Sequence, residues 1–204
     1  MVEFIYFSSQ ASTSGKALSF QKKSGGKDRK PDLMKAGRMD IALHVIISSF
    51  FLSNSYRKDR KLHLVFYGAP DPPKHIEMEV NDELEISKKD LGNLVKKILY
   101  KYRNGERKEA LPGCFIEKKS FLNIIKELLE QGKKIFILDG KGENIREVEI
   151  PENSVFIIGD HKGLPKKEIK RLSKRFRNIS IGPKTYFASQ AVTIVNNELD
   201  FRAI

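Results

Sequence analysis

Two glycine-bearing loops in the last third of the chain are the segments best suited to hold a ligand. The buried-strand patterns Ser154 to Ile158 and Asn178 to Ile181 run directly into the loops at 159–163 and 182–185. Loops that follow the strands of an α/β sheet are where ligands usually bind. Because glycine lacks a Cβ atom, the main chain there can bring its N–H and C=O groups against a flat, polar nucleoside. A tight turn between strand and helix is an equally valid interpretation of such a loop taken alone.

Other familiar site patterns are missing from the sequence. No G-x-G-x-x-G follows a strand and no G-x-x-x-x-G-K-[ST] loop is present, so a pyrophosphate cradle is not expected. The single cysteine, Cys114, has no second thiol with which to form a disulfide or share a metal. The four histidines lack ligand spacing such as H-E-x-x-H, and we expect no metal. His161 alone lies on a glycine loop, where the alternative is an ordinary surface position.

The chain carries a large excess of basic residues. Its 38 Lys and Arg oppose 26 Asp and Glu, which gives a net charge of +12 and favours a polyanion such as nucleic acid as partner. A lysine-rich solvated surface, as in heat-adapted proteins, is the alternative. The basic residues cluster between Ser8 and Pro31, where neither helical nor strand periodicity is present. We predict a mobile basic arm over residues 8–31, which either orders on RNA or is an insertion without a partner.

Composition predicts a cytoplasmic globular protein. The chain has 204 residues, of which 40% are hydrophobic, and this suffices for one substantial core or two small ones. The longest apolar run, Ile41 to Leu52, is too short to span a membrane. The N-terminal residues lack the basic flank and cleavage site of a signal peptide, so no secretion is expected.

Strand and helix patterns alternate along the chain. Strands are predicted at the two sites named above and at Val2 to Phe7, Leu62 to Tyr67, Ile76 to Val80, Cys114 to Ile116 and Lys134 to Leu138. Helices are predicted at Leu33 to Asn54 with Asp32 as cap, Lys88 to Tyr102 with Ser87 as cap, Ser120 to Leu129 and Pro165 to Phe176. This alternation predicts an α/β sandwich with a mainly parallel sheet, and residues 1–204 form one domain because no linker divides them.

Seven blocks of the sequence resemble one known family. They are Ala36–Asp40, Ser53–Asp59, Gly68–Pro73, Pro112–Gly113, Ile157–Leu164, Ser180–Gln190 and Asn197–Asp200. In this order, and over nearly the whole chain, they resemble the archaeal TrmY family, whose members are tRNA pseudouridine-54 N1-methyltransferases of the SPOUT superfamily. The basic arm departs from the family pattern, because it is longer and more charged.

The resemblance implies a fold, a cofactor and an assembly. The fold is a SPOUT-type α/β fold with a deep trefoil knot in the C-terminal region, about residues 134–204, and the protein is a homodimer. S-adenosylmethionine is held in a bent shape by three loops, and S-adenosylhomocysteine is the product. On this sequence the first loop begins at Leu138, the second at Gly159, and the third runs from Ile179 through Gly182 toward Tyr186 and Ala191.

The residue types at these positions suit the cofactor that the resemblance implies. Leu138 and Ile181 are apolar and can border adenine while main-chain groups bind its edge, although core packing is the ordinary role of such residues. Gly159 and Gly182 let the main chain approach the ribose and methionine moieties. Ser180 or Ser189 can supply a hydroxyl group.

The implied reaction needs a group that accepts a proton. N1 of pseudouridine attacks the activated methyl group and must lose its proton before or during the attack, for which a carboxylate is the natural base. Asp40 is our first candidate, because it lies near Arg38, whose guanidinium would keep it ionised. A charge at the start of a helix, paired with Arg38, is the alternative role. Asp160 is the reserve candidate and Asp59 a poorer one.

Basic residues near the site are candidates for contact with RNA. Methylation of a tRNA loop base requires that the base be extruded from its stack, and Arg38, Arg57 and Lys184 could hold the neighbouring phosphates. A solvated cationic face is the alternative for each of them. Tyr186 could border the target base or belong to the core. In the arm, the residues expected to contact RNA are Lys22, Lys23, Lys27 and Arg29.

Two other functions remain open from the sequence. The target could be a pseudouridine of ribosomal RNA, as in the related Nep1 group. The chain could also be a non-catalytic RNA-binding protein on the same scaffold, because a fold does not guarantee an activity.

Overall fold

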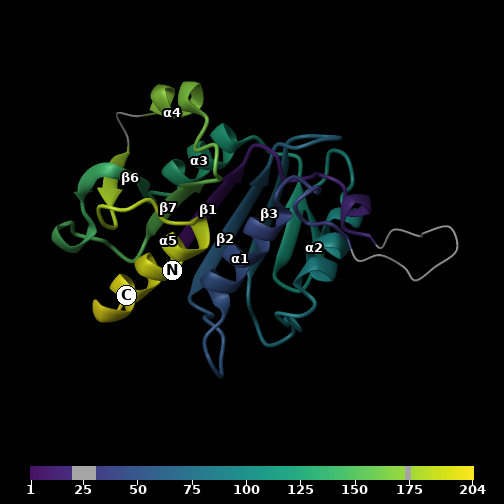
Figure 1. Ribbon diagram of the computed structural model, residues 1–204, viewed down its shortest axis with the longest axis horizontal. Coiled ribbons are helices and arrows are strands. Elements are labelled where there is room, and N and C mark those ends of the chain that lie inside the picture. The colour runs from purple at the N-terminus through teal and green to yellow at the C-terminus, as the bar shows by residue number, and fades with distance from the viewer. Residues whose placement is uncertain (20–30, 173–175) are drawn as a thin grey trace, which may run out of the picture.

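A central mixed sheet organises the molecule (Figure 1). The computed structural model describes residues 1–19, 31–172 and 176–204. Within these residues eight strands lie in the order β4-β5-β3-β2-β1-β7-β6-β8. The strands are β1 (Val2–Ser8), β2 (Arg60–Phe66), β3 (Lys74–Glu79), β4 (Lys108–Leu111), β5 (Cys114–Glu117), β6 (Lys134–Asn144), β7 (Ser154–Gly159) and β8 (Arg177–Ser180).

Helices cover both faces of this sheet. They are α1 (Met39–Phe50), α2 (Leu91–Tyr100), α3 (Phe121–Glu130), α4 (Lys166–Leu172) and α5 (Ala188–Phe201), with short 3₁₀ turns η1 (Gly15–Leu18) and η2 (Ile145–Glu147). None of the described helices is long and apolar enough to cross a membrane.

The sheet has a parallel half and an antiparallel half. Strands β2, β1, β7, β6 and β8 pair in parallel, whereas β3, β5 and β4 continue the sheet in antiparallel pairs. The prediction of an α/β fold with a mostly parallel central sheet is therefore confirmed. Strand β4 was not predicted, because its mixed residues Lys108 to Leu111 show no apolar alternation and only the pairing with β5 makes them a strand.

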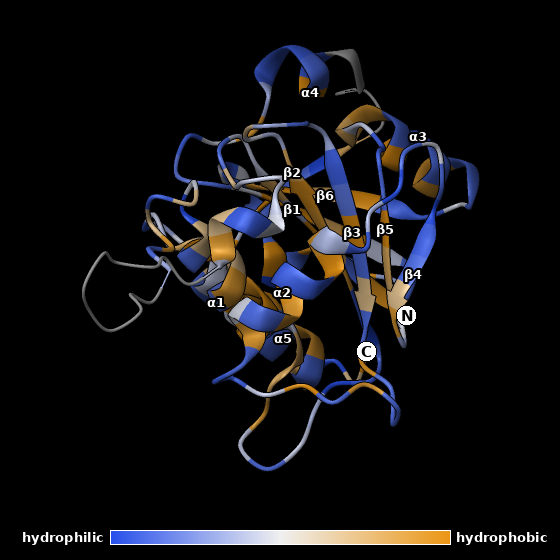
Figure 2. Cartoon of the chain, turned by 90° about the vertical axis from the view of Figure 1, so that its right-hand side faces the viewer, coloured by the Kyte–Doolittle hydropathy of each residue, from blue (hydrophilic) through white to orange (hydrophobic). Residues whose placement is uncertain are grey.

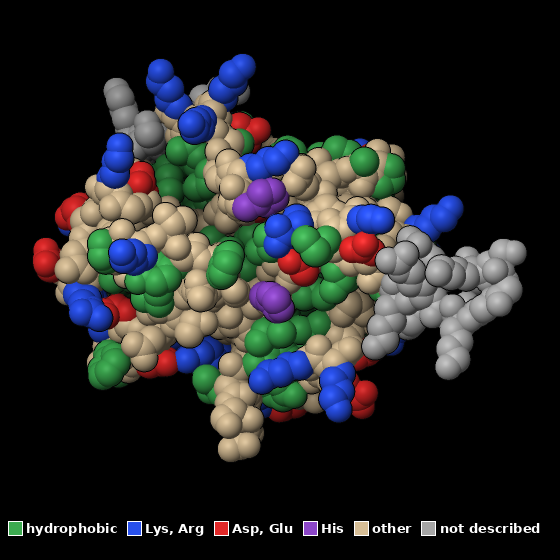
Figure 3. Space-filling view, viewed as in Figure 1, with side chains coloured by type: hydrophobic (Ala, Val, Ile, Leu, Met, Phe, Trp, Pro, Cys, Tyr) green, Lys and Arg blue, Asp and Glu red, His purple; other side chains and the backbone are tan. Residues whose placement is uncertain are grey.

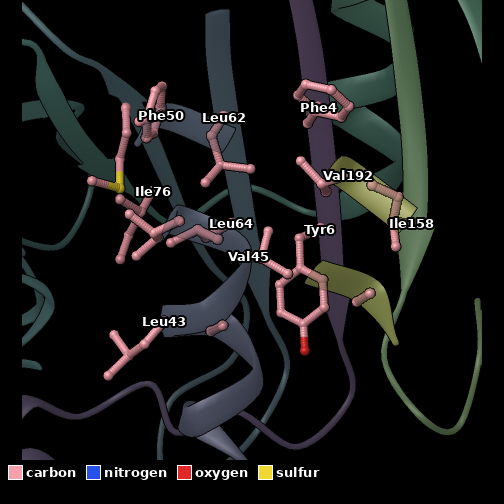
Figure 4. Close-up of a cluster of buried hydrophobic side chains, with 14 of the residues drawn as sticks. Phe4, Tyr6, Leu43, Val45, Phe50, Leu62, Leu64, Ile76, Ile158 and Val192 are labelled. Carbon is pink, nitrogen blue, oxygen red and sulfur yellow. The ribbon is translucent and has the colours of Figure 1, made fainter. Parts of the chain in front are cut away.

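Alternation along β1 builds a core on each face of the sheet. Phe4 and Tyr6 belong to the larger core, against α1, α2 and α5, while Ile5 and Phe7 belong to the smaller core against α3. Figure 4 shows the larger core around Phe4 and Tyr6, and Figure 2 shows apolar surfaces of the helices turned toward the strands. Each fully buried side chain of this size contributes about 1.5–3 kcal/mol to folding relative to an exposed one.

The first residues of α3 and α2 can be compared with the predicted ones. α3 begins as predicted, because the Ser120 hydroxyl accepts the Asn123 N–H at 3.3 Å and caps the first turn. α2 begins at Leu91 with Asp90 at its N-cap, three residues later than predicted from Ser87. Its apolar positions Leu91, Leu94, Val95 and Ile98 form the buried stripe that packs on the sheet.

The start of α1 differs from the prediction. The helix begins at Met39 rather than near Leu33, because Gly37 and Arg38 have left-handed φ angles of 74° and 62°. A Cβ atom at Gly37 would lie 1.7 Å from the carbonyl oxygen of Gln10. The chain turns sharply at Gly37 in order to pass the main chain that follows β1, a contact that apolar periodicity does not reveal.

The predicted basic arm is packed in its first part. Residues 8–19 lie against the sheet end, with Ala11 and Leu18 buried and η1 following. The Thr13 hydroxyl donates to the carbonyl oxygen of Gly68 at 3.0 Å, and the Ser12 hydroxyl donates to that of Ala69 at 3.2 Å. The prediction of a mobile arm therefore does not hold for residues 8–19, whose order comes from hydroxyl-to-main-chain bonds rather than a periodic pattern. Residues 20–30 lie outside the described part of the chain.

Candidate cofactor and substrate site

Three adjacent parallel strands end at the same edge of the sheet and bring the predicted cofactor loops together. Strand β6 pairs with β7 on one side and with β8 on the other, and Leu138 lies in register with Ile179. The loops after Gly159 and Ser180 therefore lie beside Leu138, at the edge of the sheet where α/β folds bind ligands. The predicted first loop, which begins at Leu138, falls on an irregular part of β6, because this strand continues to Asn144. A hollow of about 680 Å³ lies at the opposite end of β6 and β8, around Lys134 and Arg177.

The loop after β7 is a tight turn closed by two glycines. The Gly163 N–H donates to the carbonyl oxygen of Asp160 at 2.8 Å, and Gly163 has a φ of 79°. A Cβ atom at Gly159 would lie 2.7 Å from the carbonyl carbon of Gly163. The two glycines thus leave bare main chain at this edge, as the sequence indicated.

Asp160 fixes this loop to the end of β1. Its Oδ2 accepts hydrogen bonds from the Ser8 hydroxyl at 3.2 Å and from the Ser9 N–H and hydroxyl at 2.8 and 2.9 Å. Its Oδ1 accepts the Lys162 N–H at 2.8 Å, and the residue is 7% exposed. Because both oxygens are engaged and buried, the carboxylate positions the loop and is poorly placed to receive a substrate proton. The partners Ser8 and Ser9 were not predicted, although polar residues directly after a strand could have indicated them.

The loop after β8 is held by its own side chains. The Ser180 hydroxyl accepts the Gly182 N–H at 3.3 Å and lies 3.2 Å from the carbonyl oxygen of the same glycine. Gly182 has a φ of 139°, and a Cβ atom there would lie 3.3 Å from the Tyr186 hydroxyl oxygen. Tyr186 therefore folds back over the loop rather than entering the core.

Apolar residues line the same edge. Leu138 and Ile181 are partly buried and pack against the larger core, while Ile179 is fully buried and Ala191 nearly so. Bare main chain beside apolar side chains is the donor set that an adenine ring requires. The residues at these loops thus fit the cofactor that the sequence implied.

Arg38 and Asp40 form a two-pronged ion pair at the start of α1. The Arg38 Nε donates to Asp40 Oδ1 at 3.0 Å and its Nη2 to Oδ2 at 3.0 Å. The side chains are 35% and 25% exposed, so solvent and a substrate can reach them. The hydrogen bond from Arg38 lowers the pKa of Asp40, against the opposing effect of partial burial. The carboxylate is therefore ionised throughout the neutral range.

Tyr6 lies beneath this pair and was not predicted as a site residue. Its hydroxyl is buried and makes no hydrogen bond of normal geometry among the described residues, although the nearby Ser8 side chain lowers its pKa slightly. Burial is the main reason why the pKa of the Tyr6 hydroxyl is raised, and the negative charges of Asp160 and Asp40 raise it further. Figure 4 shows the hydroxyl directed away from Phe4, along β1. The sequence carried no signal for this, because Tyr6 follows the apolar alternation of a core strand.

Arg57 is engaged within the protein. It donates to both carboxylate oxygens of Asp200 at 2.6 and 2.5 Å and thus ties α5 to the segment before β2. Next to it, the buried Arg60 binds Asn196 of α5 at 3.0 Å and the carboxylate of Asp59 at 2.6 Å. Asp59 is therefore occupied as well, away from the glycine loops.

Exposed basic residues surround the loops after β7 and β8. His161, Lys162, Lys166, Lys167 and Lys184 are exposed, and no ion pair involves them among the described residues. Figure 3 shows basic side chains at the top of this face, where α4 lies in Figure 1. The arm residues Lys22, Lys23, Lys27 and Arg29 lie outside the described residues.

Comparison with known proteins assigns the chain to a family. A family model for SAM-dependent RNA methyltransferases matches residues 1–204. A tRNA (pseudouridine(54)-N(1))-methyltransferase of Methanocaldococcus jannaschii is 35% identical over 178 residues, which cover 82% of this chain and 86% of that protein. The same enzyme of Methanococcus aeolicus is 32% identical over 209 residues, covering 98% of each chain.

A solved structure agrees with the fold. Archaeoglobus fulgidus Nep1 bound to S-adenosylhomocysteine superposes with a TM-score of 0.59 and covers 98% of each chain at 16% identity, which supports the fold alone. The resemblance that the motifs carried is confirmed by the whole-length match. The chain belongs to the SAM-dependent RNA methyltransferase family.

Proposed function

We propose that this chain transfers a methyl group from S-adenosylmethionine to N1 of pseudouridine 54 in the T-loop of tRNA. The observation that carries the proposal is the Arg38–Asp40 pair, an ionised and accessible carboxylate in a chain whose three glycine-rich strand ends can hold the methyl donor. The curated relatives that carry this activity in their names match the chain over 82–98% of its length. Bound S-adenosylmethionine supplies an electrophilic methyl group on a sulfonium.

The cofactor-binding residues are those of the three strand-end loops. Main-chain groups at Gly159 and Gly182 would hold the ribose and methionine parts, and Ser180 would offer its hydroxyl to them. Apolar side chains such as Leu138 and Ile181 would border the adenine ring. The binding residues are Leu138, Gly159, Ile179, Ser180, Ile181, Gly182, Tyr186 and Ala191.

The same loops form a trefoil knot in this proposal. Strand β6 pairs with Ile179 of β8 through two of its residues, Leu138 and Glu143, so the segment between them interrupts the regular pairing. A Cβ atom at Gly142 would lie 2.5 Å from the main chain of Asn178, which supports close threading at this point. The knot would fix the strand ends that hold the cofactor.

Asp40 accepts the proton in the transfer. As the N1–methyl bond forms and the sulfur–methyl bond breaks, the N1 proton passes to the Asp40 carboxylate, directly or through one water molecule. Because Arg38 lowers its pKa, Asp40 is a weak base, and it would take the N1 proton as N1 gains positive charge on bonding to the methyl group. Arg38 orients the carboxylate through two hydrogen bonds.

The RNA contacts lie around the loops. Lys184 and the exposed lysines of α4 hold phosphates of the extruded loop, and Arg57 can do so only if it leaves Asp200. We also propose that Lys22, Lys23, Lys27 and Arg29 contact RNA. Two strongly exposed aromatic side chains, Phe187 and Phe201 at the ends of α5, support contact with a second copy in a homodimer. We place the enzyme in the cytoplasm with its tRNA substrate.

Mass spectrometry of the RNA after incubation with enzyme and S-adenosylmethionine tests this function. We expect one methyl group on tRNA that carries pseudouridine 54 and none on the same tRNA with uridine 54. A pseudouridine-containing ribosomal RNA hairpin serves as the competing substrate. Methylation of the hairpin alone would assign a Nep1-like function instead.

Calorimetry with S-adenosylhomocysteine separates an enzyme from a mere RNA-binding protein. A protein that binds the product is stabilised by it according to mass action. Absence of both heat and thermal stabilisation, together with tight tRNA binding, would identify a non-catalytic RNA-binding protein.

A further inference from the structure

A line of four hydrogen-bonded side chains crosses the sheet on the face away from α1. Glu3 of β1 contacts Nε2 of His63 on β2 at 2.8 Å, and Nδ1 of His63 lies 2.9 Å from Nε2 of His75 on β3. Nδ1 of His75 then contacts Glu117 of β5 at 3.0 Å. Both histidines are only 3% exposed. The methyl transfer proposed above uses none of these residues.

The two nitrogens that face each other, Nδ1 of His63 and Nε2 of His75, need a proton or a metal ion between them. The outer carboxylates are held as ions by Lys133 on Glu3 at 2.5 Å and by Lys119 on Glu117 at 2.7 Å. Each carboxylate must receive the N–H of its histidine, since a carboxylate is an acceptor only. In neutral imidazoles both inner nitrogens then carry lone pairs that face each other at 2.9 Å. Such a contact is favourable only with a proton or a metal ion between the rings.

Glu77 adds a third donor to the same place. It pairs in register with His63 across β2 and β3, and it lies two residues after His75 on the same face of β3. Its Oε2 lies 4.0 Å from Nδ1 of His63, while Lys61 and Arg107 both contact the other oxygen at 3.2 Å. One donor atom each from His63, His75 and Glu77 lies within 4.8 Å of the others.

We propose that His63, His75 and Glu77 form a binding site for a divalent first-row metal ion of the zinc class. Two imidazole nitrogens and one carboxylate oxygen are ligands that zinc accepts, with a fourth position left for water. All three side chains are oriented from outside by a second partner: a carboxylate behind each histidine and two cations behind Glu77. A carboxylate behind a ligating histidine is the usual arrangement around a metal.

A small adjustment makes the donors tetrahedral. Zinc–nitrogen bonds of about 2.0–2.1 Å place two ligating nitrogens roughly 3.3 Å apart, so the imidazoles must separate by a few tenths of an ångström. The Glu77 carboxylate must move further, by roughly 0.7 Å toward Nδ1 of His63, because its Oε2 lies 4.0 Å from that nitrogen. Glu77 faces solvent with 16% of its side chain, which gives the ion and its water a route to the site. The ion would join β2 to β3 and stabilise the antiparallel half of the sheet.

Cobalt substitution tests the site on the intact chain. Protein stripped with a chelator is titrated with Co²⁺, which gives visible absorption when bound tetrahedrally, and then with Zn²⁺. We expect one equivalent of Co²⁺ to bind and to be displaced by Zn²⁺. We also expect the melting temperature to rise by about 5–10 °C at a hundredfold excess of metal over its dissociation constant.

Matched variants locate the ligands. Glu77→Gln and His75→Gln should lose the cobalt absorption and the thermal shift. Glu79→Gln, on the same strand and also bound to Lys61, should retain both, as should His44→Gln on the exposed face of α1. Calorimetry with S-adenosylhomocysteine shows whether each variant is folded, because the cofactor loops lie elsewhere. If His75→Gln fails to fold, the Glu77→Gln variant decides alone.

Two results would overturn the proposal. Wild-type protein that gives neither tetrahedral cobalt absorption nor a thermal shift holds a shared proton between His63 and His75 instead. Cobalt binding that persists in Glu77→Gln and His75→Gln would place the metal elsewhere. Neither result bears on the methyl transfer, because RNA methylation is measured independently.

Discussion

Asp40 depends on its partner for both its charge and its direction. Arg38 holds both oxygens of the carboxylate from a left-handed position just before α1. The guanidinium lowers the pKa of Asp40. The carboxylate is therefore ionised at every pH above the ordinary aspartate pKa and stays ionised somewhat below it. Basicity is thereby reduced in exchange for a fixed orientation.

Replacing Asp40 tests its role as a base. Asp40→Asn should lower the single-turnover methylation rate at least about 100-fold, because a general base contributes on that order, while tRNA and S-adenosylhomocysteine affinities stay unchanged. The matched control is Asp59→Asn, which removes a carboxylate bound to Arg60 and should retain most of the rate. A rate in Asp40→Asn within twofold of wild type would exclude Asp40 as the base.

The pH profile provides an independent check. Because the pKa of Asp40 is lowered, the wild-type single-turnover rate should show no inflection from this group across the neutral range. The stabilising effect of the ion pair is lost only when the pH falls below the ordinary aspartate range. A neutral-range inflection that disappears in Asp40→Asn would contradict this assignment.

Cys114 should be chemically silent in the folded protein. It is fully buried, and burial raises its pKa to about 12, with a smaller contribution from Glu109. Since the thiolate is the reactive form, a thiol reagent at mildly alkaline pH should modify Cys114 only after unfolding. The modification is measured by absorbance or by mass spectrometry. Rapid modification of the native protein would show that β5 opens.

At the scale of elements, short contacts between loops decide where helices begin. Gly37 passes the carbonyl oxygen of Gln10 so closely that a Cβ atom there would lie 1.7 Å away. Gly132 has nearly the same φ, 76° against 74°, but nothing lies within 4 Å of its added Cβ atom. Comparing Gly37 with Gly132 therefore separates the free-energy cost of a left-handed φ angle from the cost of a steric clash with neighbouring main chain.

Two alanine substitutions measure this difference. Gly132→Ala should lower the free energy of unfolding by about 1–2 kcal/mol, the cost of left-handed angles in an L residue. Gly37→Ala should cost at least about 2 kcal/mol more, because the main chain of Gln10 must move. Urea unfolding of both variants gives the comparison, and equal losses would mean that the loop yields without cost.

Sequence patterns predicted the elements that bury a regular apolar stripe. β1, β7 and α3 agree closely with prediction, since each alternates or repeats against a core and α3 has its cap at Ser120. The start of α1 and strand β4 depend on contacts between distant segments, and periodicity does not contain them. α5 was not predicted as an element, because its polar face leaves a weak stripe and its packing against α1 and β7 completes it.

The candidate site was predictable to a similar extent. The glycine loops and the Arg38–Asp40 pair were found by residue type and by resemblance, and the structure brings each of these groups together. The three bonds from Ser8 and Ser9 to Asp160 were not predicted, because they join residues about 150 positions apart. The buried hydroxyl of Tyr6 was not predicted, because Tyr6 lies within a core pattern. The cross-strand approach of His63 to His75 is likewise a property of register.

At the scale of the whole molecule, the basic residues behind the net charge of +12 differ in whether they form ion pairs. Basic residues beside the antiparallel pairs bind acids, as Lys61 and Lys119 do. The lysines around α4 are exposed beside the cofactor loops. An RNA that must reach those loops would meet these lysines first.

Charge reversal distinguishes this surface from the general charge. Lys166→Glu with Lys167→Glu should weaken tRNA binding and reduce the slope of log affinity against log salt by about 2, with S-adenosylhomocysteine binding unchanged. Lys97→Glu with Lys101→Glu, at the end of α2, makes the same change in net charge and should leave the slope nearly unaltered. Equal effects of the two double variants would mean that tRNA responds to total charge only.

The main chain after β1 lies between two glycines from distant parts of the sequence. Added Cβ atoms at Gly37 and at Gly68 would lie 1.7 and 2.1 Å from the same carbonyl oxygen of Gln10. Withdrawal of any one of these three segments therefore exposes the other two to water. Amide protons of Ser12, Thr13 and Gly68, which all bond across this junction, should show one common free energy of opening in deuterium exchange. This end of the sheet would then open as one cooperative unit rather than fray residue by residue.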